Sequence, residues 1–179
     1  MKGLFLILLI GLGLTGMSQP TIYSYQVDSV VGSSTINFSS FQGKKILIVN
    51  TASGDSLSSQ YGQLKELQLQ YKDSLVVVVI PSNSFNSENT SQSTMLAFYS
   101  QDVNNKFPVS QKIEVKGSNK ASIYQWLTEK SKNGVMDSEV HRPFQKYLIS
   151  KTGKLIGVFS ARIQHLDQHI IRALTNPNN

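Results

Sequence analysis

Two almost unbroken apolar runs dominate the pattern of hydrophobic and polar positions. Lys45–Asn50 and Leu75–Ile80 are rich in Ile, Leu and Val, which is typical of parallel strands covered on both faces. Between them an apolar stripe recurs at three- and four-residue spacing, which predicts a helix that begins near Leu57. The stripe consists of Leu64, Leu67 and Tyr71. A strand, a helix and a second strand of this length predict an α/β fold.

The rest of the chain alternates between short extended segments and helical ones. A Gly-Ser-Ser turn separates the first two extended segments, so the pattern predicts an N-terminal β-hairpin. The polar stretch Asn86–Gln92 is expected to be an exposed loop. The extended segments are Thr21–Asp28, Thr35–Phe38, Phe144–Ser150 and Leu155–Phe159, and the helical ones are Ser93–Ser100, Ala121–Lys132 and about Ile163–Leu174.

The first eighteen residues have a different character from the rest. Lys2 precedes the apolar run Leu4–Leu14, and Gly16-Met17-Ser18 supplies small residues before Gln19. This order predicts a signal peptide over 1–18, cut before Gln19, and an exported domain over 19–179 that is periplasmic or extracellular. The competing interpretation is a permanent membrane anchor. Cleavage is favoured because the apolar run is about half of the roughly 20 residues needed to span a bilayer.

Charge and cysteine content narrow the possible partners and chemistry. The formal net charge is +6, and loss of Lys2 leaves 16 basic and 11 acidic residues, hence +5. Lys44-Lys45 is the only adjacent basic pair. The sequence therefore predicts no nucleic-acid binding and no membrane contact after cleavage, an unknown protein or small-molecule partner, and a monomer by default. There is no cysteine, which excludes a thiolate nucleophile and a disulfide intermediate.

The stretch from Lys45 to Tyr61 joins a strand to a helix through the small residues Thr51–Ser56. Such a junction directs backbone N–H groups and the positive helix end into one crevice. The stretch resembles the glutathione peroxidase family, whose pattern reads roughly Asn-Val-Ala-Ser-x-Cys-Gly-Leu-Thr-x-Gln-Tyr. The positions that match are Asn50, Ala52, Ser53, Leu57, Gln60 and Tyr61.

Further motifs carry the same resemblance over most of the chain. They are Phe41-Gln42-Gly43-Lys44, Pro81-x-Asn83-x-Phe85, Phe107-Pro108-Val109, Tyr124-x-Trp126-Leu127 and Phe144-x-Lys146-Tyr147-Leu148-Ile149. The resemblance and the element order imply a thioredoxin-like fold: a central mixed sheet flanked by helices, with an N-terminal β-hairpin.

The resemblance also implies an active site in which a Cys or selenocysteine is assisted by a Gln, a Trp and an Asn. Those four positions correspond here to Asp55, Ser84, Arg142 and Pro143, so none is intact. The family implies reduction of hydroperoxides in oxidative stress. The replacements instead predict an inactive pseudoenzyme that serves as a binding or structural module, with no cofactor and no metal.

Asp55 has two interpretations. It caps its helix, as a carboxylate at a helix N-terminus does, or it forms an ion pair with Arg142 that closes the crevice. Pro143 lies one residue before the position at which thioredoxin-like folds often carry a cis-proline. An ordinary trans bond is expected.

Two other groups of residues could carry chemistry. His165 and His169 are four residues apart, a spacing that can hold a metal, although we expect both on a solvated helix face. A Ser/His/Asp hydrolase built from Ser53 or Ser56, Asp55 and His141 is disfavoured, because the chain lacks the Gly-x-Ser-x-Gly elbow.

Overall fold

The computed structural model describes residues 19–88, 92–99 and 107–177. At its centre is a four-stranded sheet in the order β4-β3-β5-β6, in which β3 pairs parallel with β4 and antiparallel with β5. The strands are β3 (Lys45–Thr51), β4 (Leu75–Pro81), β5 (Lys146–Ile149) and β6 (Leu155–Phe159). The predicted mixed sheet is thus confirmed.

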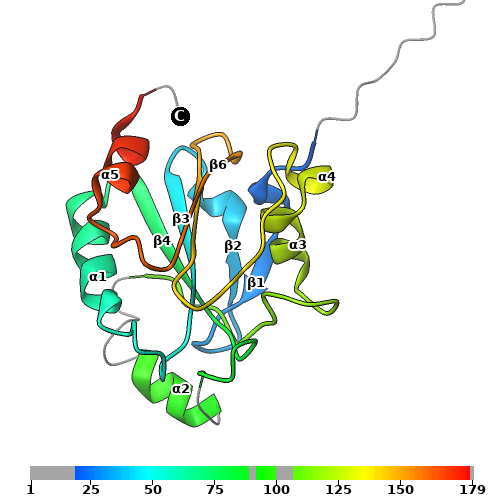
Figure 1. Ribbon diagram of the computed structural model, residues 1–179, viewed down its shortest axis with the longest axis vertical. Coiled ribbons are helices and arrows are strands. Elements are labelled where there is room, and N and C mark those ends of the chain that lie inside the picture. The colour runs from blue at the N-terminus through cyan, green and yellow to red at the C-terminus, as the bar shows by residue number, and fades with distance from the viewer. Residues whose placement is uncertain (1–18, 89–91, 100–106, 178–179) are drawn as a thin grey trace, which may run out of the picture.

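Helices cover both faces of this sheet (Figure 1). Alternate residues of each strand point to opposite faces, so the sheet separates two apolar clusters. One cluster packs under α1 (Gln60–Gln70) and α5 (Gln168–Thr175), and the other under α3 (Ser122–Thr128). The predicted N-terminal hairpin, β1 (Gln26–Asp28) with β2 (Thr35–Asn37), packs on the α3 side.

Short helices fill the connections. They are the 3-10 turns Ile22–Ser24 and Phe38–Phe41, α2 (Gln92–Phe98) and α4 (Lys130–Asn133).

Three predicted helix bounds are wrong. α1 begins at Gln60 rather than near Leu57, because overlapping tight turns occupy the residues before it. α5 begins at Gln168 rather than about Ile163. The single helix expected over Ala121–Lys132 is divided at Glu129 into α3 and α4.

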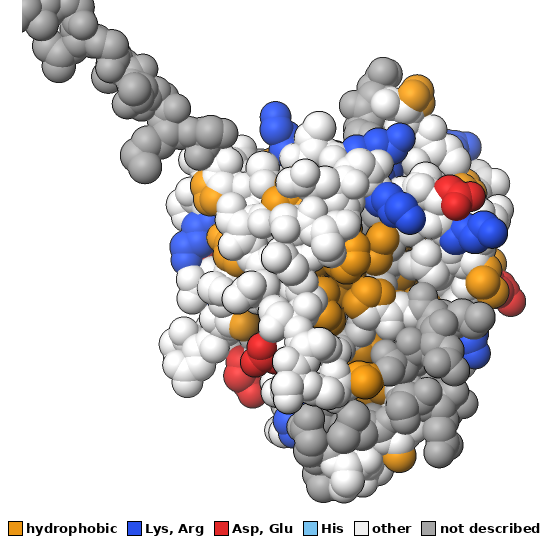
Figure 2. Space-filling model, turned by 180° about the vertical axis from the view of Figure 1, so that it is seen from behind, with side chains coloured by type: hydrophobic (Ala, Val, Ile, Leu, Met, Phe, Trp, Pro, Cys, Tyr) orange, Lys and Arg blue, Asp and Glu red, His pale blue; other side chains and the backbone are white. Residues whose placement is uncertain are grey.

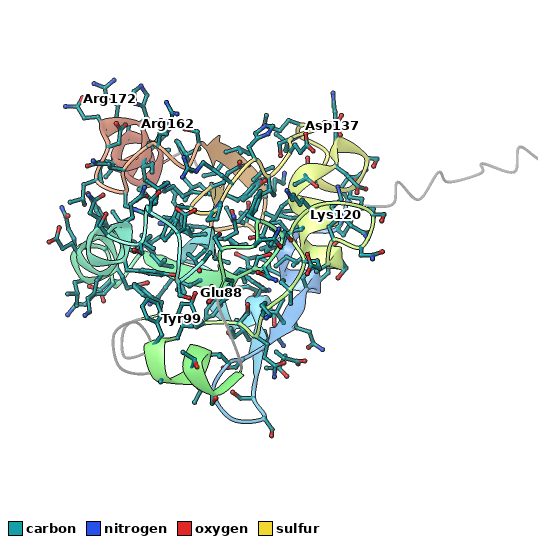
Figure 3. The ribbon with its side chains drawn as sticks, turned by 60° about the horizontal axis from the view of Figure 1, so that its bottom comes forward. Glu88, Tyr99, Lys120, Asp137, Arg162 and Arg172 are labelled. Atoms are coloured by element: carbon teal, nitrogen blue, oxygen red, sulfur yellow. The ribbon has the colours of Figure 1, made fainter. Side chains whose placement is uncertain are left out.

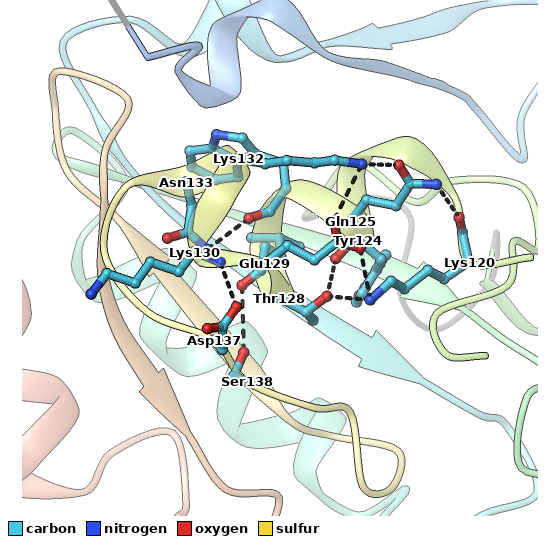
Figure 4. A network of polar contacts seen from close by, with 12 residues as sticks. Lys120, Tyr124, Gln125, Thr128, Glu129, Lys130, Lys132, Asn133, Asp137 and Ser138 are labelled. Carbon is cyan, nitrogen blue, oxygen red and sulfur yellow. Dashed lines mark hydrogen bonds and ion pairs between the residues drawn. The ribbon is translucent and has the colours of Figure 1, made fainter. Parts of the chain in front are cut away.

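The break at Glu129 is held by side-chain contacts (Figure 4). Its backbone is extended, with φ −114° and ψ 116°. Its carboxylate lies 3.1 Å from Lys120 Nζ and 3.3 Å from Lys132 Nζ, and these lysines hold the pKa of Glu129 below its usual value. Lys120 Nζ also donates to Thr128 Oγ1 at 2.9 Å. Two cations that meet at one carboxylate fix the corner between α3 and α4.

Lys45 joins the last helix to the first strand of the sheet. Its side chain is buried, and Nζ donates to the carbonyl oxygens of Ala173, Leu174 and Asn176 at 2.9, 2.8 and 2.8 Å. A cation at the C-terminal end of a helix also interacts favourably with the helix dipole. Burial, and then the charge of Lys151, lower the pKa of Lys45.

The segment 1–18, predicted to be a signal peptide, lies outside the described residues. Within the part of the chain that the structure describes, every helix is too short or too polar to cross a bilayer.

Candidate functional site

The turn after β3 carries Asp55, the position at which the resemblance places the nucleophile. Asp55 Oδ1 accepts the N–H of Leu57 at 2.9 Å, and the Asp55 carbonyl accepts the N–H of Ser58 at 3.0 Å. The residue at the N-cap of α1 is Ser59, whose side chain makes no capping bond. Asp55 therefore caps the turn before α1, and the expectation that it caps the helix itself is wrong, because the helix begins five residues later.

Arg142 faces this turn. Its Nη2 lies 3.6 Å from Asp55 Oδ1, in the ion pair that the second interpretation of Asp55 expected. The Asp55 side chain is 12% exposed and the Arg142 side chain 38%. Arg142 is held there by its backbone, because the Asn50 side-chain amide donates to the Arg142 carbonyl at 3.1 Å. No cis peptide bond occurs among the described residues, so Pro143 is trans as expected.

Phe144 gives this segment its shape. Its φ is +69°, a left-handed conformation that costs a bulky residue about 1–2 kcal/mol. Two contacts offset this cost: the Phe144 N–H donates to the Asn50 carbonyl at 2.6 Å, and the buried ring packs edge-on to Tyr61 with centroids 5.2 Å apart. The strained residue thus ties the segment before β5 to the end of β3.

The Glu88 carboxylate binds to the same turn, near Tyr99 (Figure 3). Its carboxylate accepts the Ser53 N–H at 2.9 Å and the Ser53 hydroxyl at 2.6 Å, and the Tyr99 hydroxyl at 2.9 Å. Only 3% of Glu88 is exposed. The expectation that Asn86–Gln92 is an exposed loop is therefore wrong at Glu88, because this carboxylate finds three donors inside the fold. Residues 89–91 lie outside the described part.

A row of buried hydroxyls extends from Glu88 into the core. The Tyr99 hydroxyl lies 3.0 Å from that of Tyr61 and 3.3 Å from Thr51 Oγ1. Burial raises the pKa of both tyrosines far above the usual value. Both hydroxyls therefore keep their protons at neutral pH, and Tyr99 remains a donor to the Glu88 carboxylate.

Ser84 makes its contacts elsewhere. Its hydroxyl donates to Glu114 Oε2 at 2.5 Å and accepts the N–H of Val115 at 3.0 Å. Ser82 Oγ donates to it as well, at 3.0 Å. The structure therefore brings Asp55 and Arg142 together, whereas Ser84 stabilises the loop after β4.

A buried cation that the sequence analysis did not single out lies on the α1 side of the sheet. Lys146 is fully buried, and its Nζ donates to Gln60 Oε1 at 3.1 Å and to the carbonyls of Ala161 and Ile163 at 3.2 and 2.6 Å. Desolvation lowers the pKa of Lys146 to about 7. A charged residue inside a strand was the available signal, since Lys146 follows Phe144-Gln145 within the predicted extended segment.

His165 is fully buried too, and its two ring nitrogens have no hydrogen-bond partner. Burial, together with the charge of Lys146, lowers the pKa of His165 to about 2. His165 precedes α5, whereas the exposed His169 lies on that helix and contacts Asp167 Oδ1 at 2.7 Å. The expectation that both histidines share a solvated helix face is therefore wrong for His165. Among the described residues, no group of three His, Cys, Asp or Glu side chains could hold a metal.

The hydrolase constellation is not assembled either. The Ser53 hydroxyl donates to Glu88, and the described contact of His141 is a hydrogen bond from its backbone N–H to Gln145 Oε1 at 3.2 Å. Asp55 is engaged with Leu57 and Arg142. No imidazole thus reaches a serine hydroxyl in the contacts described.

A family model described as "Glutathione peroxidase" matches residues 22–128, which is more than half of the chain. The chain belongs to the glutathione peroxidase family. It is 31% identical over 140 residues to glutathione peroxidase-like peroxiredoxin 2 of Saccharomyces cerevisiae, covering 76% of this chain and 86% of the yeast protein. It is 28% identical over 158 residues to the glutathione peroxidase homolog BsaA of Bacillus subtilis, covering 86% and 98%.

Solved structures agree with this membership. The apo crystal structure of Trgpx has a TM-score of 0.66 and 27% identity, over 89% of this chain and 99% of that one. A thiol:disulfide interchange protein of the thioredoxin family from Chlorobium tepidum has a TM-score of 0.60 at 16% identity, over 88% of this chain and 97% of that one. This second likeness shows the fold alone, which is thioredoxin-like as predicted.

Proposed function

We propose that this glutathione peroxidase family member is exported and catalytically inactive, and that it serves as a binding or structural module. The observation that carries the proposal is at position 55. There the family resemblance expects a Cys or selenocysteine, and this chain has an aspartate in an ion pair with Arg142.

The chemistry of peroxide reduction supports inactivity. A thiolate attacks the O–O bond, becomes a sulfenic acid, and is reduced again by a second thiol. A carboxylate is a hard and poor nucleophile toward peroxide and has no such redox cycle. Because the chain contains no cysteine at all, no other residue supplies a thiol.

The surroundings of Asp55 support the same proposal. A developing anion in the crevice would need hydrogen-bond donors that are free to bind it. The Ser53 N–H and hydroxyl already donate to Glu88, and the Arg142 guanidinium lies against Asp55. The chain's own carboxylates thus take up the donors and the cation that a reacting anion would use.

The second candidate is a peroxidase that reduces hydroperoxides in response to oxidative stress. The observation that favours it is membership of the family, together with relatives that are named glutathione peroxidase-like peroxiredoxins. Fold and membership alone do not decide activity.

Peroxide consumption by purified residues 19–179 separates the two candidates, with glutathione or a thioredoxin system as reductant. We expect the rate of buffer alone. A rate well above buffer that is lost in Asp55→Asn would overturn the proposal and assign catalysis to the carboxylate.

Asp55→Cys is the matched control for the assay. It places a thiol in the same turn, and a thiol-reactive dye counts it. We expect it to stay at the rate of a free thiol, because Ser84, Arg142 and Pro143 do not supply the donors that the resemblance expects. A variant that also carries Ser84→Gln, Arg142→Trp and Pro143→Asn tests whether those donors restore turnover.

Export is tested separately by expressing residues 1–179 in a bacterial host and measuring the mass of the purified protein by mass spectrometry. We expect a periplasmic protein whose mass corresponds to residues 19–179. Recovery of the full-length mass in the membrane fraction would instead support the anchor.

A further inference from the structure

Five lysines that are scattered along the sequence meet at one end of the folded molecule. This basic end, as we call it, lies where β3 and β4 begin, opposite the crevice. Its lysines are Lys44, Lys72, Lys130, Lys151 and Lys154. Four of them are exposed and Lys44 is half-buried. None forms an ion pair with another described residue.

Hydrogen bonds bring the segments of Lys44, Lys72 and Lys151 together. Lys44 Nζ donates to the carbonyl of Lys72 at 3.0 Å. The carbonyl of Lys151 accepts the N–H of Gly43 at 3.4 Å and the hydroxyl of Tyr23 at 2.7 Å. The loop before β3, the turn before β4 and the β5–β6 turn therefore meet at one surface.

A hollow of about 350 Å³ connects this surface to α4. Lys154 lines it from the β5–β6 turn, and Gly134 and Val135 line it from the end of α4. The carbonyl of Lys130 accepts the N–H of Gly134 at 2.8 Å, which closes α4 and places Lys130 next to the hollow. In Figure 2 the Lys and Arg side chains gather mainly over the upper half of the visible face.

Carboxylates are few at this end. Asp73 follows Lys72, and Asp137 follows the short α4 and accepts the backbone N–H of Lys130 at 2.8 Å. Glu129, which precedes Lys130, is already paired with Lys120 and Lys132, so the five lysines outnumber the carboxylates here. At the crevice end, by contrast, Arg142 is neutralised by Asp55.

Two exposed apolar side chains follow α4, and one of them, Val135, lines the same hollow as Lys154. Val135 and Met136 follow α4 and are 46% and 41% exposed. Exposed apolar residues on a lysine-rich surface are typical of a protein that inserts into the headgroup region of a bilayer while its cations contact anionic lipids.

The course of the chain adds an independent reason. Gln19, the first described residue, lines the same hollow as Val135 and Lys154. The apolar run Leu4–Leu14 lies a few residues before it in the sequence. Until it is cleaved, a leader held in a membrane would place this end of the domain next to that membrane.

We propose that the basic end is a docking surface for anionic phospholipid bilayers, with Val135 and Met136 at its apolar centre. This goes beyond the proposed loss of peroxidase chemistry and does not depend on it. It also departs from the sequence expectation of no membrane contact, because the fold collects charges that are dispersed along the chain.

The test is co-sedimentation of residues 19–179 with vesicles of phosphatidylcholine, with and without 30% phosphatidylglycerol. We expect binding to the anionic vesicles at low salt, little to the neutral ones, and release at high ionic strength. Equal binding to both kinds of vesicle, or none to either, would overturn the proposal.

Matched triple variants locate the surface. Lys130→Gln with Lys151→Gln and Lys154→Gln is expected to lower the partition coefficient roughly a hundredfold, at about fivefold per lysine. The control Lys65→Gln with Lys112→Gln and Lys116→Gln changes the net charge equally and is expected to bind much as the parent does. Equal losses in the two variants would mean that net charge alone drives binding.

Two further measurements complete the test. Val135→Ser with Met136→Ser is expected to weaken binding at every salt concentration, because it removes the apolar contact. Dextran sulfate serves as a soluble polyanion. Saturable binding to it without binding to vesicles would assign the basic end to an acidic polymer instead of a bilayer.

Discussion

The molecule contains two buried lysines that look alike and lie in different electrostatic environments. Lys45 and Lys146 are each at most 2% exposed, and each donates three hydrogen bonds to oxygen atoms without a carboxylate partner. Lys45 meets the C-terminal carbonyls of α5, where the helix dipole is negative. Lys146 meets one amide and two loop carbonyls, beside His165.

The difference shows that the number of hydrogen bonds does not by itself determine the protonation state of a buried lysine. Desolvation lowers the pKa of both lysines, and for Lys146 it lowers the value to about 7. Deeper burial accounts for the larger shift at Lys146, and the C-terminal end of α5 in addition favours the charged amine of Lys45. The following predictions test this contrast, from the largest expected effect to the smallest.

Lys146 is expected to make the protein more stable as the pH rises. Its pKa is lowered from 10.5 to about 7, so the unfolded chain binds one more proton than the folded chain between these values. The free energy of unfolding should therefore increase by about 3 kcal/mol between pH 7 and pH 9.5. Urea unfolding at several pH values measures it, and Lys146→Met should remove this increase.

Lys45→Met is the matched control, since it makes the same substitution at the other buried lysine. The contrast between the two lysines fails if Lys45→Met flattens the pH dependence as much as Lys146→Met does. The measurement stays below pH 10 because the buried tyrosines, whose pKa values are raised, destabilise the folded state above that pH.

His165 is expected to make the protein sensitive to acid. Its pKa is lowered from 6.5 to about 2, so below pH 6.5 the unfolded chain binds a proton that the folded chain does not. Between pH 6.5 and 4.5 this should remove about 2–3 kcal/mol of stability. His165→Leu should show a smaller loss than the parent by that amount, whereas His169→Gln, at an exposed histidine, should follow the parent.

Loss of the Lys45 amine should loosen α5. Lys45→Met leaves three carbonyls at the end of the helix without their common donor, and we expect a loss of about 1–2 kcal/mol at pH 7. Amide hydrogen exchange should quicken in 168–175 and stay unchanged in α1. Unchanged exchange in α5 would show that the lysine does not hold the helix.

The smallest expected effect on stability comes from the Asp55–Arg142 ion pair. Its cation is partly exposed, in contrast to the two buried lysines. A double-mutant cycle with Asp55→Asn and Arg142→Met should give a coupling free energy of about 0.5 kcal/mol, because solvent screens the half-exposed guanidinium. Asparagine keeps the acceptor for the Leu57 N–H. A coupling above 2 kcal/mol would mean that the pair is effectively buried.

The sheet could be predicted from the sequence because each strand has a recognisable local pattern of apolar and turn residues. Lys45–Thr51 and Leu75–Pro81 are continuous apolar runs, and the hairpins are marked by their turns. Helix bounds were harder, since α1 and α5 begin after tight turns whose side chains also fit helical spacing. Glu129 breaks a helix through ion pairs with Lys120 and Lys132 on either side of it. Rules based on one helical turn do not predict such a break, because Lys120 lies nine residues away.

The candidate site was predictable only where the resemblance supplied positions. The contact between Asp55 and Arg142 was hypothesised because two replaced positions carry opposite charges. Glu88 was missed, and His165 was wrongly placed on a solvated helix face, because the burial of both depends on contacts far along the chain, such as that of Ser53 with Glu88. Polar residues in cores are determined by tertiary structure, and local periodicity does not reveal them.

Glu88 has one more consequence. It is a carboxylate ligand covalently tethered to its own receptor, the N–H and hydroxyl of Ser53. A tethered group acts at an effective concentration in the millimolar range or above, so any diffusing anion must outcompete it. A mutation that placed a thiol in this turn would meet the same competitor. Thiol chemistry in this turn would therefore require displacement of Glu88 as well as replacement of Asp55.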